Sequence, residues 1–254
     1  KMVGPAAKDV WLFTFHAFCA RFLRMEIDKL GGYASNFVIY DTNDSKNVLK
    51  EVLKELNLDD KNFPVNSLIG QISNAKNNMQ DAKEYARNAA DFHSQKIAEI
   101  FNVYEKKLLL NNALDFDDLL LLTIRLLQQN EEVRTKYQER FSYIMVDEYQ
   151  DTNHVQYMLT KILSEKHHNL CVVGDVDQSI YGWRGADIQN ILDFEKDYPD
   201  AKVIKLEQNY RSTQVILDAA NAVIEHNTAR KPKELWTENP NGTPITYYQA
   251  VDER

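Results

Sequence analysis

Four short apolar runs along the chain share one design, in which consecutive apolar residues, many of them β-branched, give way to polar ones. Runs without apolar and polar alternation are typical of strands buried on both faces, as in a parallel sheet covered by helices. In open α/β sheets the ligand crevice lies beyond the carboxyl ends of the strands, so we expect the chemistry where these runs end. The runs are Val10–Phe13, Tyr143–Val146, Leu170–Val173 and Val203–Leu206.

Helical periodicity dominates the long stretch between the first two runs. Apolar residues recur at i, i+3 and i+4 with Lys and Glu between them, which predicts helices within Asp44–Leu56, Asp81–Lys107 and Phe116–Gln129. The stretch is much longer than a crossover helix needs, so it indicates an all-helical insertion. Its predicted edges lie near Gly31–Gly32 and Asn111–Asn112.

The chain after the fourth run predicts one more helix and one more strand. Ser212 or Thr213 can cap a helix that runs through Asn227. Residues Asn239–Gly242 form a predicted turn before the strand-like Ile245–Tyr248. The predicted class is therefore α/β: part of a parallel sheet covered by helices, with a large all-helical inserted subdomain.

Composition and charge narrow the possible functions. The 254 residues are 44% hydrophobic and 27% charged, which is typical of a globular protein and excludes disorder as the main state. The formal net charge of −8 excludes a generally basic surface, so contacts with nucleic acid must be local. Cys19 and Cys171 lie in apolar runs and predict no disulfide framework. With no apolar run near the roughly 20 residues of a membrane helix, we expect a cytoplasmic protein without membrane contact.

The end of the second run carries a carboxylate pair, Asp147–Glu148. A nucleotide hydrolase needs one carboxylate to hold Mg²⁺ and another to orient or deprotonate the attacking water. Taken alone, the pair fits better as the acidic start of a helix. The surrounding Val146–Asn153 shifts the balance toward catalysis, although Asp151 and Thr152 can also act as helix caps.

The loop after the third run, Gly174–Asp187, combines an amide, an aromatic ring and an arginine between glycines. Gln178 can donate to a phosphate oxygen, and Trp183 beside Arg184 offers a stacking surface next to a cation. A lone Trp more often packs in a core, but the neighbouring Arg184 and glycines weaken that interpretation.

Two further strand ends carry weaker signals. Asn209–Arg211 puts an aromatic ring beside a guanidinium, which can stack a purine and neutralise a γ-phosphate, but it could equally be a helix start with a surface arginine. Thr14 and His16 can bind a DNA phosphate, although a lone His is more often structural and Phe15 more often part of a core.

Five segments resemble, in order and wording, the superfamily 1 DNA helicases of the UvrD/Rep/PcrA group. The resemblance extends over the whole chain and is closest to the PcrA-type members around Trp236–Pro240. The long Gly-Asp-Val-Asp-Gln-Ser-Ile-Tyr-Gly-Trp-Arg-Gly-Ala-Asp segment makes it highly specific. The five segments are Thr14–Phe18, Leu114–Leu120, Asp147–Asn153, Gly174–Asp187 and Gln208–Ser212.

The resemblance implies an ATP-driven motor that moves 3′ to 5′ along single-stranded DNA and unwinds duplex DNA in repair or replication. Asp147 and Glu148 would hold Mg²⁺, and Glu148 would also be the base that activates water. Gln178 would sense the γ-phosphate. Tyr210 would stack on the adenine of ATP, and Arg211 would be an arginine finger from the second motor lobe.

The resemblance also implies the DNA contacts and the domain division. Thr14, His16, Tyr181, Trp183 and Arg184 match DNA-contacting positions, with Trp183 stacking on bases. The sheet would be RecA-like, and the helical insertion would contact duplex DNA. The implied parts are residues 1–30 and 114–206 in the first RecA-like lobe, 31–113 in the insertion, and 207–254 at the start of the second lobe.

The sequence departs from the family pattern in its phosphate loop. None of the 8 glycines is followed by Lys, so there is no Gly-x-x-x-x-Gly-Lys-Ser/Thr loop, and the adenine-reading glutamine motif and the later motifs of the second lobe are missing. We therefore expect an internal fragment of a helicase that is inactive by itself. A non-catalytic DNA-binding or protein-interaction module and the helicase half of a helicase-nuclease remain alternatives.

Overall fold

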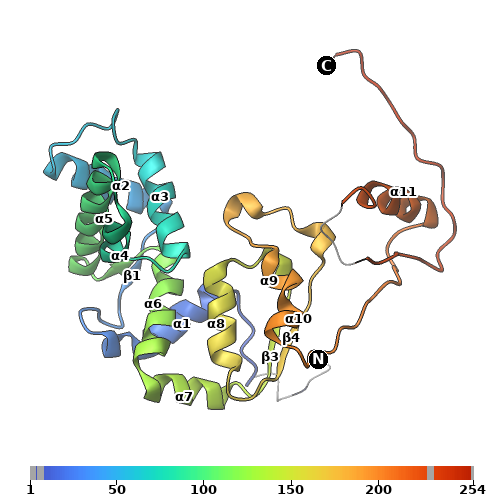
Figure 1. Ribbon diagram of the computed structural model, residues 1–254, viewed down its shortest axis with the longest axis horizontal. Helices are drawn as coiled ribbons and strands as arrows, with labels where there is room; N and C mark the ends of the chain where they lie inside the picture. The colour runs from blue at the N-terminus through green and yellow to red at the C-terminus, as the bar shows by residue number, and fades with distance from the viewer. Residues whose placement is uncertain (1–3, 5–8, 228–231, 253–254) are drawn as a thin grey trace.

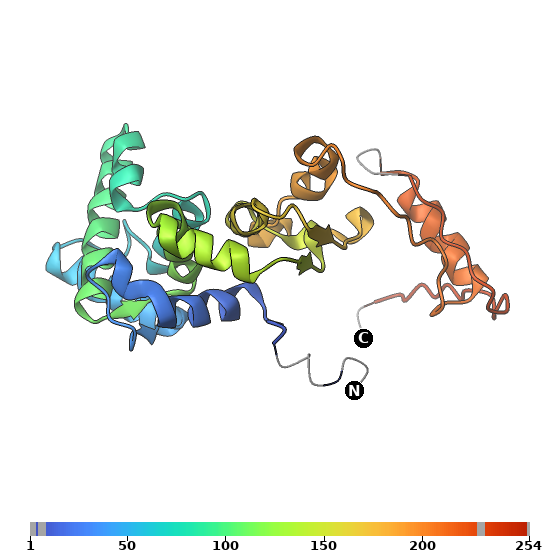
Figure 2. The same ribbon diagram turned by 90° about the horizontal axis from the view of Figure 1, so that it is seen from below.

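The computed structural model describes residues 4, 9–227 and 232–252. In Figure 1 the helices α2 to α5 lie at one end, α1, α6 and α8 lie beside them, the strands β3 and β4 follow, and α11 lies at the other end. The turned view in Figure 2 keeps this order. The chain thus passes through successive packed groups rather than around one centre.

The first group is a helical core beside the strands β3 and β4. It contains α1 (Phe15–Glu26), α6 (Phe116–Gln129), α7 (Glu131–Arg140) and α8 (His154–Ser164). Their apolar faces meet in one fully buried cluster, and each buried Leu or Phe contributes roughly 1.5–3 kcal/mol. The helix predicted over Phe116–Gln129 is confirmed with those bounds, because its apolar stripe faces this cluster.

The second group has its own buried cluster. Its helices are α2 (Thr42–Glu55), α3 (Val65–Asn77), α4 (Ala82–Asn88) and α5 (Phe92–Leu110). The helix predicted over Asp44–Leu56 is confirmed.

The segment predicted to be helical over residues 81–107 is helical, and the structure divides it into two helices, α4 and α5. Asp91 has extended backbone and accepts a hydrogen bond from Ser94 N in a capping box, so the chain restarts a helix there.

Two short strands join the entry and exit of this second group. β1 (Val38–Ile39) pairs in parallel with β2 (Ala113–Leu114). The 3₁₀ helix η2 (Ile27–Leu30) precedes Gly31 and Gly32, which have φ of +74° and +84° and so need glycine. The chain therefore enters and leaves the second group of helices at neighbouring points.

The second pair of strands is β3 (Ile144–Val146) and β4 (Leu170–Val172), also parallel. Both predicted strands are confirmed, but their predicted burial on both faces is wrong. Met145 is 77% exposed and Cys171 is exposed, since only one face of these strands packs on helices. The coarse α/β class is confirmed: helices dominate, and the described sheets are small and parallel.

The other three predicted strands are wrong. Residues 10–13, 203–206 and 245–248 have no strand hydrogen bonds within the described ranges. Leu206 is 80% exposed and Tyr247 84% exposed. Strand character requires a neighbouring strand, and an apolar run cannot supply one by itself.

Short helices and one longer helix complete the chain. Thr213 is the residue before α11 (Gln214–Ile224), as predicted, although its side chain makes no capping bond and the helix ends three residues before Asn227. None of the described helices is both long enough and apolar enough to cross a membrane. The remaining short helices are η3 (Tyr149–Asp151), η4 (Val176–Gln178), η5 (Gly182–Arg184), α9 (Gln189–Leu192) and α10 (Phe194–Asp197).

Candidate nucleotide and DNA site

The end of β3 presents two exposed carboxylates. Asp147 and Glu148 follow Val146 directly, and Asp147 Oδ1 accepts a hydrogen bond of 3.0 Å from Glu148 N. Glu148 has a left-handed backbone with φ of +51°, which is uncommon for a residue other than glycine. This turn ends the strand abruptly and starts η3, so the carboxylates lie at the strand end.

The end of β4 is bonded to the end of β3 by one buried amide, Gln150. Its Nε2 donates to Glu148 Oε2 at 2.8 Å, and its Oε1 accepts from Asp175 N at 2.9 Å. A Cβ at Gly174 would lie 2.6 Å from that Oε1 and 2.8 Å from Ile191 Cδ1. Glycine is therefore required where the two strand ends meet, and Gln150 is a site residue that sequence reasoning missed.

Gln178 lies in the loop that follows β4, as predicted. Its Nε2 donates to Asp175 Oδ2 at 2.7 Å. Burial raises the pKa of Asp175, but hydrogen bonds from Lys233 and Gln178 outweigh it and hold the pKa below its usual value. Lys233 also lies 3.5 Å from Asp177, so the C-terminal segment contacts this loop. The structure thus brings Asp147, Glu148 and Gln178 to two neighbouring strand ends.

Tyr210 and Arg211 lie apart from those strand ends. Tyr210 is 79% exposed, and its hydroxyl donates to Gln208 Oε1 at 2.7 Å. The Arg211 amide donates to Asn209 Oδ1 at 2.9 Å, in the turn before α11. Figures 1 and 2 agree that α11 lies away from β3 and β4. Among described residues, no bond joins Tyr210 or Arg211 to the predicted catalytic carboxylates.

Two of the predicted DNA contacts, His16 and Tyr181, line one cavity of about 490 Å³. The His16 ring lies 5.5 Å from the Phe116 ring, and burial lowers the pKa of His16, which favours the neutral imidazole. Thr14, two residues before His16, caps α1, and its hydroxyl accepts a hydrogen bond of 3.3 Å from Ala17 N. The other lining residues are Ser73, Asn77, Asp117, Asp151, Asn153 and Gln156.

Trp183 lies in η5, on the surface. It is 75% exposed, and its ring lies 6.4 Å from that of Tyr181. The alternative in which Trp183 packs in a core is therefore wrong. Gly185 ends η5 with φ of +86°, which turns the chain sharply after the ring. The Arg184 side chain lies outside the described part of the structure.

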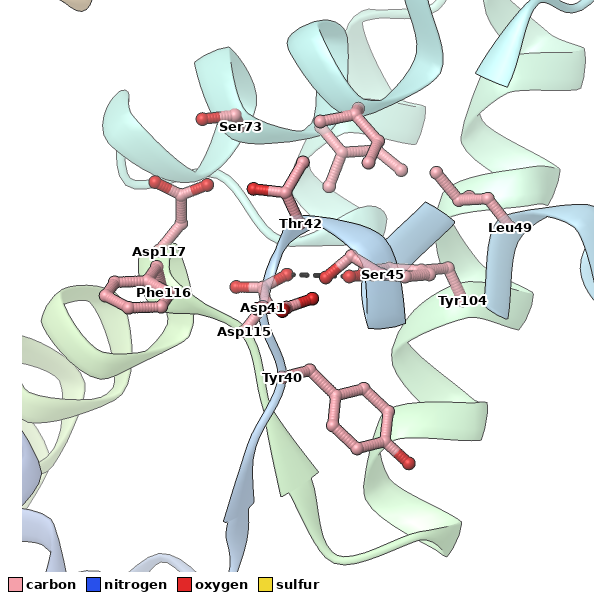
Figure 3. Close-up of a pocket in the computed structure, with 12 residues that line it drawn as sticks. Tyr40, Asp41, Thr42, Ser45, Leu49, Ser73, Tyr104, Asp115, Phe116 and Asp117 are labelled. Carbon is pink, nitrogen blue, oxygen red and sulfur yellow. Dashed lines mark hydrogen bonds between the residues drawn. The ribbon is translucent and has the colours of Figure 1, made fainter. Parts of the chain in front are cut away.

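A second cavity, of about 240 Å³, adjoins the first through Ser73 and Asp117. Figure 3 shows Asp41, the cap of α2, with Thr42 and Ser45 of α2 on one side of it and the start of α6 on the other. The two cavities together follow the last turns of α3.

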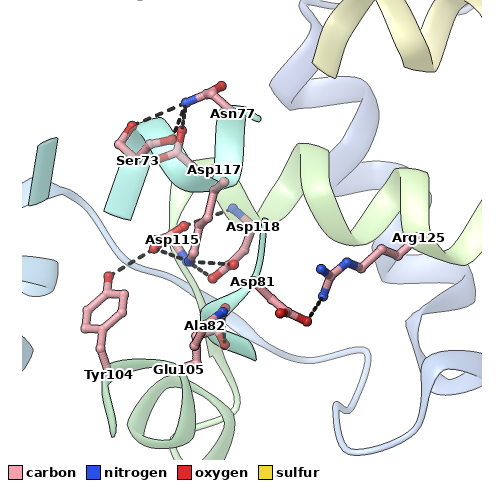
Figure 4. A network of polar contacts seen from close by, with 11 residues as sticks. Ser73, Asn77, Asp81, Ala82, Tyr104, Glu105, Asp115, Asp117, Asp118 and Arg125 are labelled. Atoms are coloured by element: carbon pink, nitrogen blue, oxygen red, sulfur yellow. Dashed lines mark hydrogen bonds and ion pairs between the residues drawn. The ribbon is translucent and has the colours of Figure 1, made fainter. Parts of the chain in front are cut away.

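The Leu-Asp-Phe-Asp-Asp segment, quoted above only for its resemblance, builds a buried charge cluster beside these cavities (Figure 4). Lys76 Nζ lies 2.6 Å from both Asp115 Oδ2 and Asp118 Oδ1, and the Tyr104 hydroxyl donates to Asp115 at 3.0 Å. Burial lowers the pKa of Lys76, but the two carboxylates outweigh it and raise the pKa well above its usual value. The cluster joins α3 to the start of α6.

Burial and the Asp115 carboxylate raise the pKa of Asp118 to about 7. Burial acts on Asp115 in the same direction, but Lys76 outweighs it and holds the Asp115 pKa below its usual value. Within the described ranges, no group of three or more His, Cys, Asp or Glu side chains is arranged to hold a metal ion.

Comparison with known proteins agrees with this arrangement. Residues 1–199 match the UvrD/REP helicase N-terminal domain, and residues 204–254 match the UvrD-like helicase C-terminal domain. The ATP-dependent DNA helicase PcrA of Staphylococcus aureus (strain Mu50) is 55% identical over 254 residues, and that of Staphylococcus epidermidis (strain ATCC 35984) is 54% identical over 253 residues. The matches cover 100% of this chain and 35% of each relative, so the chain spans about a third of their length. The chain belongs to the UvrD/REP helicase family.

Proposed function

We propose that this chain is the central part of an ATP-dependent DNA helicase that moves 3′ to 5′ on single-stranded DNA and unwinds duplex DNA during repair or replication. One observation carries the proposal: Gln150 bonds the β3 end, with its exposed Asp147–Glu148 pair, to the β4 end that leads to Gln178. A phosphoryl-transfer site needs carboxylates and a neutral donor fixed at one edge in this way.

The packing supports a division of the chain into three parts. Residues 1–30 and 114–206 form the first RecA-like lobe, 31–113 form the helical insertion that contacts the duplex, and 207–254 begin the second lobe. The separate buried clusters support this division, as does the parallel pairing of β1 with β2 where the insertion begins and ends.

Glu148 is the general base, and Asp147 with Glu148 would hold Mg²⁺. Both side chains are exposed at the strand end, and Mg²⁺ in phosphate sites is bound by one or two carboxylates together with phosphate oxygens and water, so the residues fit the ion. When bound, the ion neutralises charge on the phosphates. The hydrogen bond from Gln150 orients the Glu148 carboxylate, which accepts the proton of the attacking water.

Tyr210 and Arg211 act when the two lobes close around ATP. Tyr210 stacks on adenine, Arg211 neutralises charge on the γ-phosphate in the transition state, and Gln178 donates to a γ-phosphate oxygen. The exposure of Tyr210 and the separation of α11 from β3 and β4 support an open arrangement of these parts.

Single-stranded DNA lies along the surface that carries Thr14, His16, Tyr181, Trp183 and Arg184. Trp183 stacks on a base, because its ring is exposed and base stacking tolerates any sequence. The neutral His16 and the Tyr181 hydroxyl in the shared cavity supply polar contacts.

A non-catalytic binding module has less support. The carboxylate pair, Gln178 and the Gln150 junction are all in place, and a chain that only bound DNA or protein would need none of them.

The experiment that tests the proposal is Glu148→Gln in the full-length protein that contains this chain. The amide keeps the shape of the side chain but cannot take a proton, so kcat for DNA-stimulated ATP hydrolysis should fall at least about 100-fold while ATP binding is retained. The exposed Asp200→Asn is the matched control and should leave kcat unchanged. Full hydrolysis by Glu148→Gln would refute the assignment.

A further inference from the structure

The last turn of α3, in the helical insertion, is bonded directly to the start of α8. Asn77 Oδ1 accepts a hydrogen bond of 2.7 Å from Asn153 Nδ2. The Asn77 amide nitrogen in turn donates to Asp117 Oδ1 at 2.9 Å and to Ser73 O at 2.9 Å. Figure 4 shows Asn77 beside Ser73 and Asp117, with the side chains turned toward one another. One amide therefore links three helices.

Asn153 is the cap of α8 and ends the segment that carries the carboxylates. Its side chain accepts from Gln156 N at 2.9 Å, and the Gln156 side chain accepts from Asn153 N at 3.1 Å, so the two residues form a capping box. Capping boxes fix the entry of the chain into a helix.

The residues between Glu148 and Asn153 are held on both sides. The Thr152 hydroxyl donates to Tyr149 O at 2.7 Å, and Asp187 N donates to Thr152 O at 2.9 Å. Gln150 holds Glu148 from the same short segment. A shift of the Asn153 cap therefore moves a tightly bonded segment that ends at the Glu148 carboxylate.

We propose that Asn77 is a positioning residue that couples DNA in the cavity to the Glu148 carboxylate through Asn153. Asn77 and Asn153 both line the cavity that contains His16 and Tyr181, so a strand seated there lies against their hydrogen bond. The inference rests on the proposed function, because it assumes DNA in this cavity and hydrolysis at Glu148.

The two asparagines at the end of α3 provide a matched comparison. Asn78, the next residue, is exposed, and its amide bonds only locally, to Asn74 O at 2.8 Å and Asn74 Oδ1 at 3.3 Å. Asn77→Ala removes the bridge to Asn153, whereas Asn78→Ala removes an amide of the same kind that does not reach α8.

The test uses the full-length protein and measures kcat with and without a single-stranded oligonucleotide. Asn77→Ala and Asn153→Ala should each lower the ratio of DNA-stimulated to DNA-free kcat by about 5- to 10-fold. The double variant should lower it no further than either single variant, because the hydrogen bond between Asn77 and Asn153 is already lost in each single variant. Asn78→Ala should keep the wild-type ratio.

Melting temperature separates coupling from loss of structure. A lowered ratio in Asn77→Ala at an unchanged melting temperature supports the inference. Asn153→Ala also removes the cap of α8, so its melting temperature is expected to fall. Wild-type stimulation in Asn77→Ala, or effects of Asn77→Ala and Asn153→Ala that multiply in the double variant, would overturn it. Glu148→Gln is assayed in parallel: if it also hydrolyses ATP normally, the proposed function fails as well, and if it is inactive, the failure concerns Asn77 alone.

Discussion

Lys76 is fully buried between Asp115 and Asp118, whereas Asp147 and Glu148, which follow later in the chain, face solvent. Both regions gather carboxylates at the N-terminal side of a helix. In the first, each carboxylate has a partner: Lys76 contacts both, and Asp115 and Asp118 cap α6 reciprocally. In the second, the hydrogen bonds of the Asp147 and Glu148 side chains within the described ranges come from Glu148 N and Gln150 Nε2.

The difference in burial indicates that the charges of the Lys76 cluster stabilise the fold, whereas Asp147 and Glu148 are available to bind a ligand. A buried ion pair that loses one partner leaves an uncompensated charge in a low-dielectric interior, which is strongly destabilising. An exposed carboxylate is solvated in either state, so its removal changes folding little. Substitutions around Lys76 should therefore change stability, and substitutions at the strand ends and in their loops should change activity.

The largest expected effect is at Arg211. In the full-length protein, Arg211→Ala should lower kcat for ATP hydrolysis on the order of 10³-fold, because an arginine finger neutralises charge only in the transition state. Arg211→Lys should restore little, since an ammonium lacks the planar fork. The exposed Arg87→Ala is the control for general charge. Unchanged kcat in Arg211→Ala would remove Arg211 from the site.

Lys76→Met should have the next largest effect, a loss of folding stability. The methionine leaves the buried carboxylates of Asp115 and Asp118 without their cation, so the free energy of unfolding should fall by roughly 3–5 kcal/mol. Urea denaturation measures this. Lys196→Met removes an exposed lysine that pairs with Asp193 and should leave the urea midpoint of unfolding unchanged. Equal transitions for both variants would contradict the structural role of the cluster.

Trp183→Ala should lower DNA affinity without changing stability. Loss of one stacking platform should weaken single-stranded DNA affinity about 5- to 100-fold. The melting temperature should stay unchanged because the ring is 75% exposed. Phe92, 74% exposed on α5, supplies the control variant Phe92→Ala. Normal DNA affinity in Trp183→Ala would remove Trp183 from the proposed DNA-binding surface.

Asp118 gives the smallest effect, a change in pH dependence. Its pKa is raised in the folded state to about 7, from about 4 in an unfolded chain, so its protonated form stabilises the fold at low pH. That contribution is lost as the pH rises through this interval. Asp118→Asn should remove it and make the free energy of unfolding less dependent on pH between about 4 and 7. An unchanged pH dependence would show that Asp118 does not titrate there.

Helices were predictable where their signals are local. The α6 prediction is correct at both ends because the apolar spacing and the Asp115 cap lie within the helix and its first turn. The apolar periodicity over residues 81–107 predicts helical structure there but does not locate the break between α4 and α5, because the periodicity continues across it.

Strands were predictable only where a partner exists. The runs at β3 and β4 and those at residues 10–13 and 203–206 look alike in sequence, yet only the first two pair with each other. Inter-strand hydrogen bonds come from a segment distant in sequence, and the composition of a single run does not specify that segment.

The sequence by itself determined the positions of α2 and α6 and, through its motifs, the candidate residues Asp147, Glu148 and Gln178, because these depend on neighbours within a few positions. Only the tertiary structure decided that Gln150 joins two strand ends and that Lys76 neutralises two carboxylates some forty positions away. Those roles depend on which side chains of distant segments share a buried space. Tertiary packing determines which of these side chains meet, and local sequence patterns do not predict it.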